Sequence, residues 1–228
     1  MKKKNLGFTL AEVLITLGII GIVAAMTIPN LITTHQQKES VVKLQKAISV
    51  MNQAYRLAYD DVGEATAEEA RALGVQGYFD KFWAPYIKVL ELCNKTNCGY
   101  EAHEPFKSPN GSHYSLGVES GSNRIVFITM DGFLYMIVTN YGANADGVSL
   151  TSKMIYVDIN GIRKPNVVGK DVFLLERKID GEKGGGVVPY CSEFSDTQVN
   201  YRCKQDSSEC CAEKIKRAGW RIDKSYPW

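Results

Sequence analysis

The first uninterrupted apolar run of the chain covers residues 8–32 and contains a single acid, Glu12. As a helix this run would extend about 37 Å, which is enough to cross a hydrocarbon core of about 30 Å. Three lysines at residues 2–4 precede the run, and no comparable basic cluster directly follows it. The pattern predicts one membrane-spanning helix with a cytoplasmic N-terminus, and it places everything after Thr33 on the exported side.

Residues 38–62 carry a different pattern. Apolar residues recur there at steps of three and four, which is the spacing of one face of an amphipathic helix. The face consists of Val41, Leu44, Ile48, Met51, Tyr55, Ala58 and Val62. Because this segment starts close behind the membrane span, we expect a single long helix, half in lipid and half packed on a domain. A coiled coil is the alternative, but three heptads without consistent flanking charges favour it less.

Two shorter helical patterns follow. Thr66 and Glu69 have the spacing of a capping box, which predicts a short helix that stops at Gly74. Residues 78–92 then place aromatic and aliphatic residues at helical spacing, and Pro85 divides this stretch or starts a new helix. An aromatic stripe of this kind belongs more often to a core than to a ligand platform.

Beyond residue 111 the period of the pattern changes to two, which predicts strands. We expect them at residues 114–118, 124–130, 133–139, 154–159 and 172–175. Asp131 and Gly132 join the second and third of these strands and are a strong hairpin signal. A long helix followed by antiparallel strands predicts an α+β fold.

The last part of the chain is rich in cysteine. Three glycines at residues 184–186 predict a flexible linker into a tail that covers about residues 187–228. Within this tail we expect one short helix near residues 210–218. Trp220, Tyr226 and Trp228 are expected to pack against the sheet.

Six cysteines lie in the region predicted to be exported, where an even number is typical of disulfides. Cys93 and Cys98 are the expected pair and would close a small loop. The other four are Cys191, Cys203, Cys210 and Cys211, and their pairing stays open. Vicinal Cys210 and Cys211 fit the geometry of a mutual disulfide poorly. A zinc site with His103 and His113 is the alternative for the first pair, but the histidine spacing and the compartment favour the disulfide.

Glu12 is out of place in a segment whose only role is to be hydrophobic. An ionised carboxylate costs roughly 2.5–3.5 kcal/mol at the centre of a membrane helix. An ordinary secretory signal peptide with a small-residue stop near residues 23–25 would explain the lysines and the apolar run, and so would a plain signal anchor. Neither explains the acid.

Six residues carry a resemblance that does explain it. Gly7, Phe8, Thr9, Leu10, Glu12 and Pro29 resemble the N-terminus of the type IV pilin family, which includes the type II secretion pseudopilins. The chain departs from the family pattern only at Ala11, where a larger aliphatic residue is usual. The motif covers about a tenth of the chain.

The resemblance implies cleavage by a prepilin peptidase between Gly7 and Phe8, followed by N-methylation of the new Phe8 amine. It divides the chain into a leader (1–7), a transmembrane and assembly helix (8–32) and an exported pilin-like domain (33–228). In the assembled fibre Glu12 of one subunit would pair with the charged Phe8 amine of a neighbour, and losing either partner would leave a buried charge uncompensated. Pro29 is expected to kink or locally melt the helix because it removes one backbone hydrogen bond.

The charge of the mature chain gives no strong nucleic-acid signal. The net charge of +2 becomes −1 once the three leader lysines are removed, since 2 − 3 = −1. A local basic cluster remains at Lys214, Lys216, Arg217 and Arg221, but a basic face on a terminal helix is most often solvated surface.

A turn-rich segment supplies the candidate metal ligands. Asp158, Asn160 and Asp171 carry oxygen atoms of the kind that calcium prefers, and some major pseudopilins bind calcium in this general region. The same residue types also favour plain structural turns, because they bond to their own backbone. No other cofactor is expected.

Three functional hypotheses follow. The first is a structural subunit, stored in the bacterial inner membrane, that polymerises with copies of itself and other pilins into a pilus or periplasmic pseudopilus. It would require a peptidase and N-methyltransferase, and a membrane platform with a cytoplasmic ATPase. The second is a minor pilin whose C-terminal head binds DNA, a surface or secreted cargo. The third is an exported enzyme with an unusual anchor, which is disfavoured because the sequence contains no evident catalytic triad, nucleotide loop or catalytic metal array.

Overall fold

The computed structural model describes residues 9–94, 96–121, 123–139, 154–178, 185–204 and 208–228. The chain divides into two compact units, Met1–Glu39 and Ser40–Trp228. Helix α1 (Leu10–Val62) contributes residues to both units.

In the first unit, α1 exposes its apolar residues on all sides. Leu10 is 78% exposed, and the large aliphatic side chains as far as Ile32 are exposed as well. Among the described residues α1 is the one helix that is long and apolar enough to cross a membrane. The helix continues through Pro29 without interruption. The structure therefore shows no local melting at this proline, and the expected kink stays a prediction.

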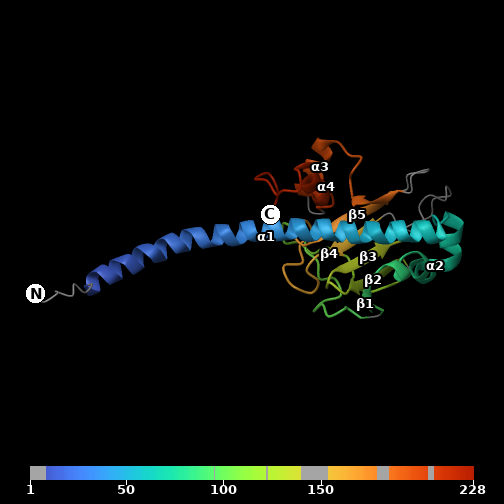
Figure 1. Ribbon diagram of the computed structural model, residues 1–228, viewed down its shortest axis with the longest axis horizontal. Coiled ribbons are helices and arrows are strands. Elements are labelled where there is room, and N and C mark those ends of the chain that lie inside the picture. Colours follow the sequence, from blue (N-terminus) through green and yellow to red (C-terminus); the bar gives the residue numbers. More distant parts are fainter. Residues whose placement is uncertain (1–8, 95, 122, 140–153, 179–184, 205–207) are drawn as a thin grey trace, which may run out of the picture. The chain divides into compact units, whose positions relative to one another are not determined.

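In the second unit, α1 turns one face toward the domain. Its buried side chains are Val41, Leu44, Ala47, Met51, Ala54, Tyr55 and Ala58. This is the amphipathic face that the spacing predicts, with Ile48 partly buried and Val62 at the exposed end. Figure 1 shows this part of α1 lying along the sheet.

The segment after α1 folds partly as expected. Helix α2 (Ala67–Phe82) starts with Thr66 as its N-cap, and the Thr66 hydroxyl accepts a hydrogen bond from the Glu69 amide. The helix is interrupted at Gly74, whose φ of 66° lies in the left-handed region that glycine tolerates. The break predicted at this glycine is therefore present, although a second helical stretch continues beyond it.

The helix predicted over residues 78–92 is wrong in its second half. After the short 3-10 turn η1 (Ala84–Tyr86), the chain forms strand β1 (Val89–Leu92). Pro85 cannot continue the helix, and β1 pairs antiparallel with residues of β2 that follow much later in the sequence. A distant pairing partner thus overrides the local helical spacing.

The domain contains a six-stranded antiparallel sheet in the order β1-β2-β3-β4-β5-β6. The remaining strands are β2 (Arg124–Thr129), β3 (Leu134–Val138), β4 (Met154–Asp158), β5 (Val172–Lys178) and β6 (Gly186–Pro189). Asp131 and Gly132 form the predicted hairpin between β2 and β3, with Gly132 at a φ of 81°. The helix and sheet together confirm the α+β prediction.

The two faces of the sheet are covered by different parts of the chain. Alternate residues such as Phe127 and Tyr135 face the core formed with α1 and α2. Their neighbours Val126 and Met136 face a second core, which is closed by the irregular segment from Cys93 to Val118. The sheet therefore lies between a helical layer and a loop layer.

That loop layer includes residues 114–118, which were predicted to form a strand. Their backbone amides bond inside the loop instead, with Tyr114 donating to the carbonyl of Phe106 and Val118 to that of His103. The strand prediction is therefore wrong. The apolar side chains of this segment pack in the second core, but its backbone does not pair with the sheet.

The C-terminal region adds two helices, α3 (Asp196–Lys204) and α4 (Cys211–Arg217). The predicted helix at residues 210–218 corresponds to α4, whereas α3 was not predicted. Gly186, the last glycine of the predicted linker, belongs to edge strand β6; residues 179–184 lie outside the described part of the chain. Tyr226 is buried, and Trp220 and Trp228 pack partly against the core that α1, α2 and one face of the sheet share. Their contact with the sheet itself stays a prediction.

Candidate functional site

The candidate assembly site begins at the N-terminus of α1, where the structure describes Thr9 but neither Gly7 nor Phe8. The Glu12 carboxylate accepts hydrogen bonds from the Thr9 amide and the Thr9 hydroxyl, both at 2.8 Å. The Glu12 amide in turn donates to the Thr9 hydroxyl at 3.2 Å. These reciprocal bonds form a capping box, which satisfies amides that a helix start leaves unpaired.

This role of Glu12 was not predicted, although its signal in the sequence is local. Thr9 and Glu12 have the same three-residue spacing as Thr66 and Glu69, where the box was predicted. The carboxylate thus has a partner within its own chain. An amine from a neighbouring subunit would have to compete with, or add to, the two bonds from Thr9.

The surface next to this carboxylate is apolar. The exposed side chains between Leu10 and Ile32 are those of leucine, isoleucine, valine and methionine, at 41–78% exposure. In water such a surface is unfavourable by about 25 cal/mol per Å². It requires either lipid or other apolar helices as its environment, and both are compatible with an assembly helix.

The disulfides in the second unit are now assigned. Cys93 pairs with Cys98, as the spacing predicts, and the two histidines of the zinc alternative contact glutamates: His103 lies near Glu119 and His113 near Glu104. The pairs left open by the sequence are Cys191–Cys210 and Cys203–Cys211. The vicinal cysteines therefore bond to different partners, and together they tie β6 and α3 to α4.

The predicted calcium ligands come together in space. The Asn160 side-chain nitrogen donates to Asp171 at 3.0 Å, and the Asn160 amide donates to Asp158 at 3.1 Å. Burial raises the pKa of Asp158, and the nearby charge of Asp171 adds to the rise. Burial also raises the pKa of Asp171. Two carboxyl groups are thus held close together away from water.

These oxygens already accept hydrogen bonds from the protein. Asp171 accepts from the backbone amides of Asn166 at 2.8 Å and Val167 at 2.6 Å, and Asp158 accepts from the Tyr100 hydroxyl at 2.9 Å. Asn160 turns its amide nitrogen, rather than its oxygen, toward Asp171. In the described part of the chain no three His, Cys, Asp or Glu side chains form a metal-binding group. The arrangement is that of a hydrogen-bonded loop, and calcium stays a prediction to be tested.

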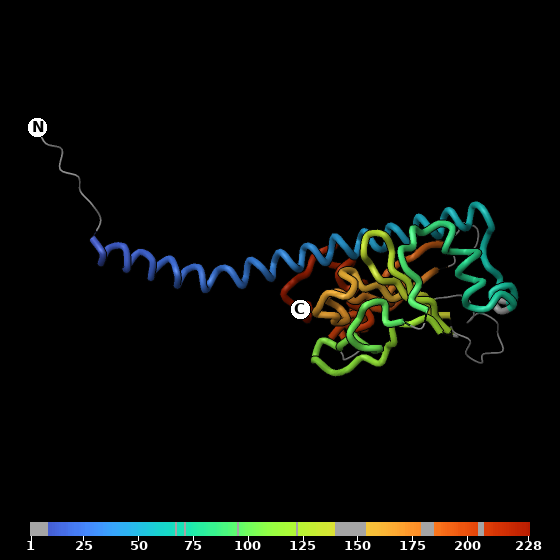
Figure 2. Tube along the Cα trace, turned by 90° about the horizontal axis from the view of Figure 1, so that it is seen from below, coloured from blue at the N-terminus to red at the C-terminus, as the bar shows by residue number. Residues whose placement is uncertain are grey.

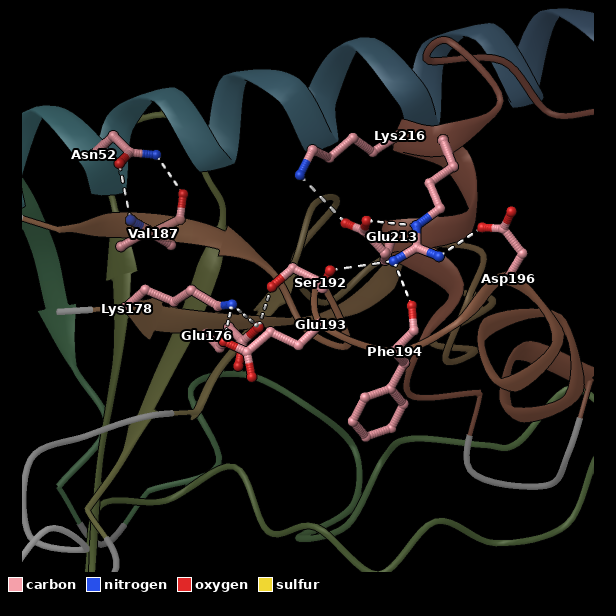
Figure 3. Close-up of polar contacts among 11 residues, drawn as sticks. Asn52, Glu176, Lys178, Val187, Ser192, Glu193, Phe194, Asp196, Glu213 and Lys216 are labelled. Atoms are coloured by element: carbon pink, nitrogen blue, oxygen red, sulfur yellow. Dashed lines mark hydrogen bonds and ion pairs between the residues drawn. The ribbon is translucent and has the colours of Figure 1, made fainter. Parts of the chain in front are cut away.

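A polar groove of about 890 Å³ lies between α1 and the β6 edge of the sheet. Asn52 lines it and bonds to both backbone groups of Val187: its nitrogen donates to the Val187 carbonyl at 2.5 Å, and its oxygen accepts from the Val187 amide at 2.8 Å. Figure 3 shows this pair of bonds between helix and strand. Asn52 thereby occupies the open side of an edge strand, which would otherwise be available for pairing.

The same close-up shows how α4 is fixed to the loop before α3 (Figure 3). The Arg217 guanidinium donates to Glu213 at 2.8 Å and to Asp196 at 2.6 Å. It also donates to the backbone carbonyls of Ser192 and Phe194. The hydrogen bonds that Arg217 donates to Glu213 and Asp196 raise the pKa of its guanidinium above the usual value. This arginine is therefore committed to internal contacts.

Comparisons with known proteins agree with the N-terminal features. The prokaryotic N-terminal methylation motif, the processing signal of type IV pilins and pseudopilins, matches residues 2–28. Together with the exposed apolar helix and the α+β domain, it defines the class of protein: a pilin-like exported subunit. The chain belongs to the Family of unknown function (DUF6613), which matches residues 30–228. Comparisons with curated proteins and with solved structures gave no match.

Proposed function

We propose that this protein is a structural subunit of a type IV pilus or a type II secretion pseudopilus and has no enzymatic activity. A prepilin peptidase cleaves it between Gly7 and Phe8, and the new Phe8 amine is methylated. The subunit is stored in the bacterial inner membrane, with its N-terminus in the cytoplasm before assembly. A membrane platform with a cytoplasmic ATPase then adds it to a fibre of its own copies and other pilins.

The observation that carries this proposal is the combination of the methylation motif with the exposed apolar part of α1. A helix that is apolar on every side is not stable in water unless lipid or other parts of a protein cover it. In a fibre, neighbouring helices cover it. Glu12 is then the one acid of that bundle, and the charged amine of a neighbouring Phe8 compensates it.

The capping box allows an experiment that separates the two roles of Glu12. Glu12→Gln keeps a side-chain oxygen that can accept from the Thr9 amide but removes the charge. Thr9→Ala weakens the box but keeps the charge. We expect Glu12→Gln to abolish fibre assembly and Thr9→Ala to retain it, as measured by recovery of sheared fibres and electron microscopy.

Processing is checked in the same samples. Mass spectrometry of the mature protein should find methylated Phe8 as the first residue in all three proteins, because neither substitution alters Gly7 or Phe8. A first residue near Met26 would instead indicate an ordinary secretory signal and remove the polymerisation argument. Normal fibres from Glu12→Gln would show that the charge pair is not required.

A second candidate is a minor pilin that binds DNA, a surface or secreted cargo through its C-terminal head. The polar groove beside β6 and the disulfide-tied α3 and α4 are the features that favour it. Binding by such a head should survive Glu12→Gln, whereas polymerisation should not. An exported enzyme is the third candidate, and a reaction that survives the same substitution would favour it.

A further inference from the structure

The C-terminal tail, residues 218–228, combines aromatic and basic side chains on one end of the second unit. Trp220 and Trp228 are half-buried, whereas Arg221 and Lys224 are exposed. Tryptophan and basic residues in this combination are typical of surfaces that lie at the boundary between lipid and water.

The tail is a fixed part of the domain. Gly219 and Trp220 both adopt positive φ values, 70° and 58°, which reverse the chain at the end of α4. Their amides bond back to the carbonyls of Lys216 and Ile215, as in a Schellman cap. Tyr226 then donates from its hydroxyl to the Gly169 carbonyl. A bulky residue such as tryptophan rarely occupies this backbone region, so its placement is specified by the surrounding structure.

Most basic residues of the cluster recognised in the sequence are already engaged. Lys214 is buried and donates to Asn200 at 2.6 Å. Lys216 lies 3.4 Å from Glu213, and Arg217 is committed to the contacts of its guanidinium described above. These residues hold α4 in place and offer little charge to a partner.

Arg221 and Lys224 differ from them. Within the described part of the chain neither has an acidic partner at ion-pair distance, and the acid between them, Asp223, accepts hydrogen bonds from Ser225. Lys170 lies 6.0 Å from the centre of the Trp228 ring and extends the basic surface beside it. Three cations of the tail surface, Arg221, Lys224 and Lys170, thus stand against one exposed acid, Asp223, and the net side-chain charge of this surface is positive.

The tail lies at the end of the second unit where α1 enters it, as both views show (Figures 1 and 2). The apolar run ends at Ile32 and this unit begins at Ser40. Eight residues of chain span about 12 Å as helix and at most about 28 Å when fully extended, so this tether limits how far this end of the domain can lie from the bilayer surface.

We propose that the tail surface docks the domain on anionic lipid headgroups while the subunit is stored in the membrane. Arg221, Lys224 and Lys170 contact the headgroup phosphates, and Trp220 and Trp228 lie at the interface. This inference rests on the membrane-stored subunit of the proposed function. Nucleic acid is the competing partner, but its binding depends largely on cations that neutralise phosphates, and two or three free cations supply few such contacts.

The test uses the full chain reconstituted in phosphatidylcholine vesicles with or without about 30% phosphatidylglycerol, since basic surfaces respond to anionic lipid. Lipids with a nitroxide at the headgroup quench nearby tryptophan fluorescence. Trp83 is buried and serves as the internal reference, since the quencher cannot reach it. We expect quenching of Trp220 and Trp228 only in the anionic vesicles, and a decrease in high salt.

Arg221→Ser with Lys224→Ser should lower the ratio of docked to free domain about 25-fold, at about fivefold per basic residue near the surface. Arg56→Ser with Lys88→Ser is the matched control, because both residues are exposed and lie on other elements of the domain, on α1 and just before β1. The control should leave the quenching unchanged. Equal quenching in both lipid compositions, or none, would overturn the proposal.

Flotation of the vesicles separates this result from failure of the proposed function. A chain that floats but shows no headgroup quenching is anchored without docking, which contradicts only the present inference. A chain that does not float contradicts membrane storage itself. Tight binding of duplex DNA that is lost in the double variant would make nucleic acid the partner of this surface and overturn the lipid proposal.

Discussion

From Leu10 to Ile32 the large apolar side chains of α1 are exposed, whereas from Val41 to Ala58 the same helix buries seven side chains. The first part is apolar on all sides and has one acid. The second part alternates apolar and polar positions, so that one face packs on the sheet. The first part therefore depends on a partner outside the chain, and the second part finds its partner within the chain.

This difference determines which residues in the sequence specify each part. The assembly segment is specified by residues close together in sequence, from Gly7 to Pro29, and its environment is supplied by other molecules. The exported domain is specified by contacts between residues that are far apart in sequence. Substitutions should therefore affect folding in one part and assembly in the other.

The largest expected contrast comes from shortening one aliphatic side chain in each part. Leu44 is completely buried between α1 and the sheet, so Leu44→Ala should lower the free energy of unfolding of the domain by about 3 kcal/mol. Ile20 is exposed, so Ile20→Ala should change it by less than about 0.5 kcal/mol. Urea denaturation of the full chain in detergent, followed by tryptophan fluorescence, measures both values. Similar losses for the two variants would show that the two parts of α1 do not differ in this way.

Local signals in the sequence predicted the local structure well. The capping box at Thr66, the hairpin at Asp131 and Gly132, and the buried face of α1 all follow from residues within a few turns of one another. The methylation signal at the N-terminus is also a short motif. Each of these features can be predicted without knowing which distant residues the segment contacts.

Features that depend on distant partners were missed. Strand β1 exists because it pairs with β2, which begins more than thirty residues later, and its own sequence has helical spacing. The two C-terminal disulfides could not be chosen from four closely spaced cysteines. The bonds between Asn52 and Val187 join residues 135 positions apart. No local pattern marks Asn52 as different from its polar neighbours on α1.

Asn52 gives the second contrast, because it is a polar anchor in the packed part of α1. Asn52→Ala removes both bonds to the β6 backbone, and we expect a loss of about 2 kcal/mol in the free energy of unfolding. A Cβ atom at Gly186 would approach the Asn52 oxygen to 2.8 Å, so Gly186→Ala should displace this side chain and cause a similar loss. Gln53→Ala is the matched control on the exposed face and should be nearly neutral. If Asn52→Ala left the free energy of unfolding unchanged, water would replace the two hydrogen bonds of Asn52 without cost.

The two capping boxes give a smaller contrast that compares the same chemistry in both parts. Thr66→Ala removes the acceptor for the Glu69 amide and should destabilise the domain by about 1 kcal/mol. Thr9→Ala removes the equivalent acceptor for Glu12 but should leave domain unfolding unchanged. Urea denaturation under the conditions used for Leu44→Ala measures both. If Thr9→Ala also destabilised the domain, the start of α1 would be coupled to the folding of the sheet.

Calcium is expected to have the smallest effect, because the domain already satisfies the oxygens that would bind it. Asp171 accepts two backbone amides, and Asn160 presents a nitrogen to it. A cation would have to replace these bonds and turn the Asn160 amide, whose oxygen has no partner in the described structure. We therefore expect millimolar calcium, compared with a chelator, to leave the melting temperature of the domain unchanged. A rise of several degrees that disappears in Asp171→Asn would instead establish a calcium site, and the stability of the exported part would then depend, like that of the assembly helix, on something outside the chain.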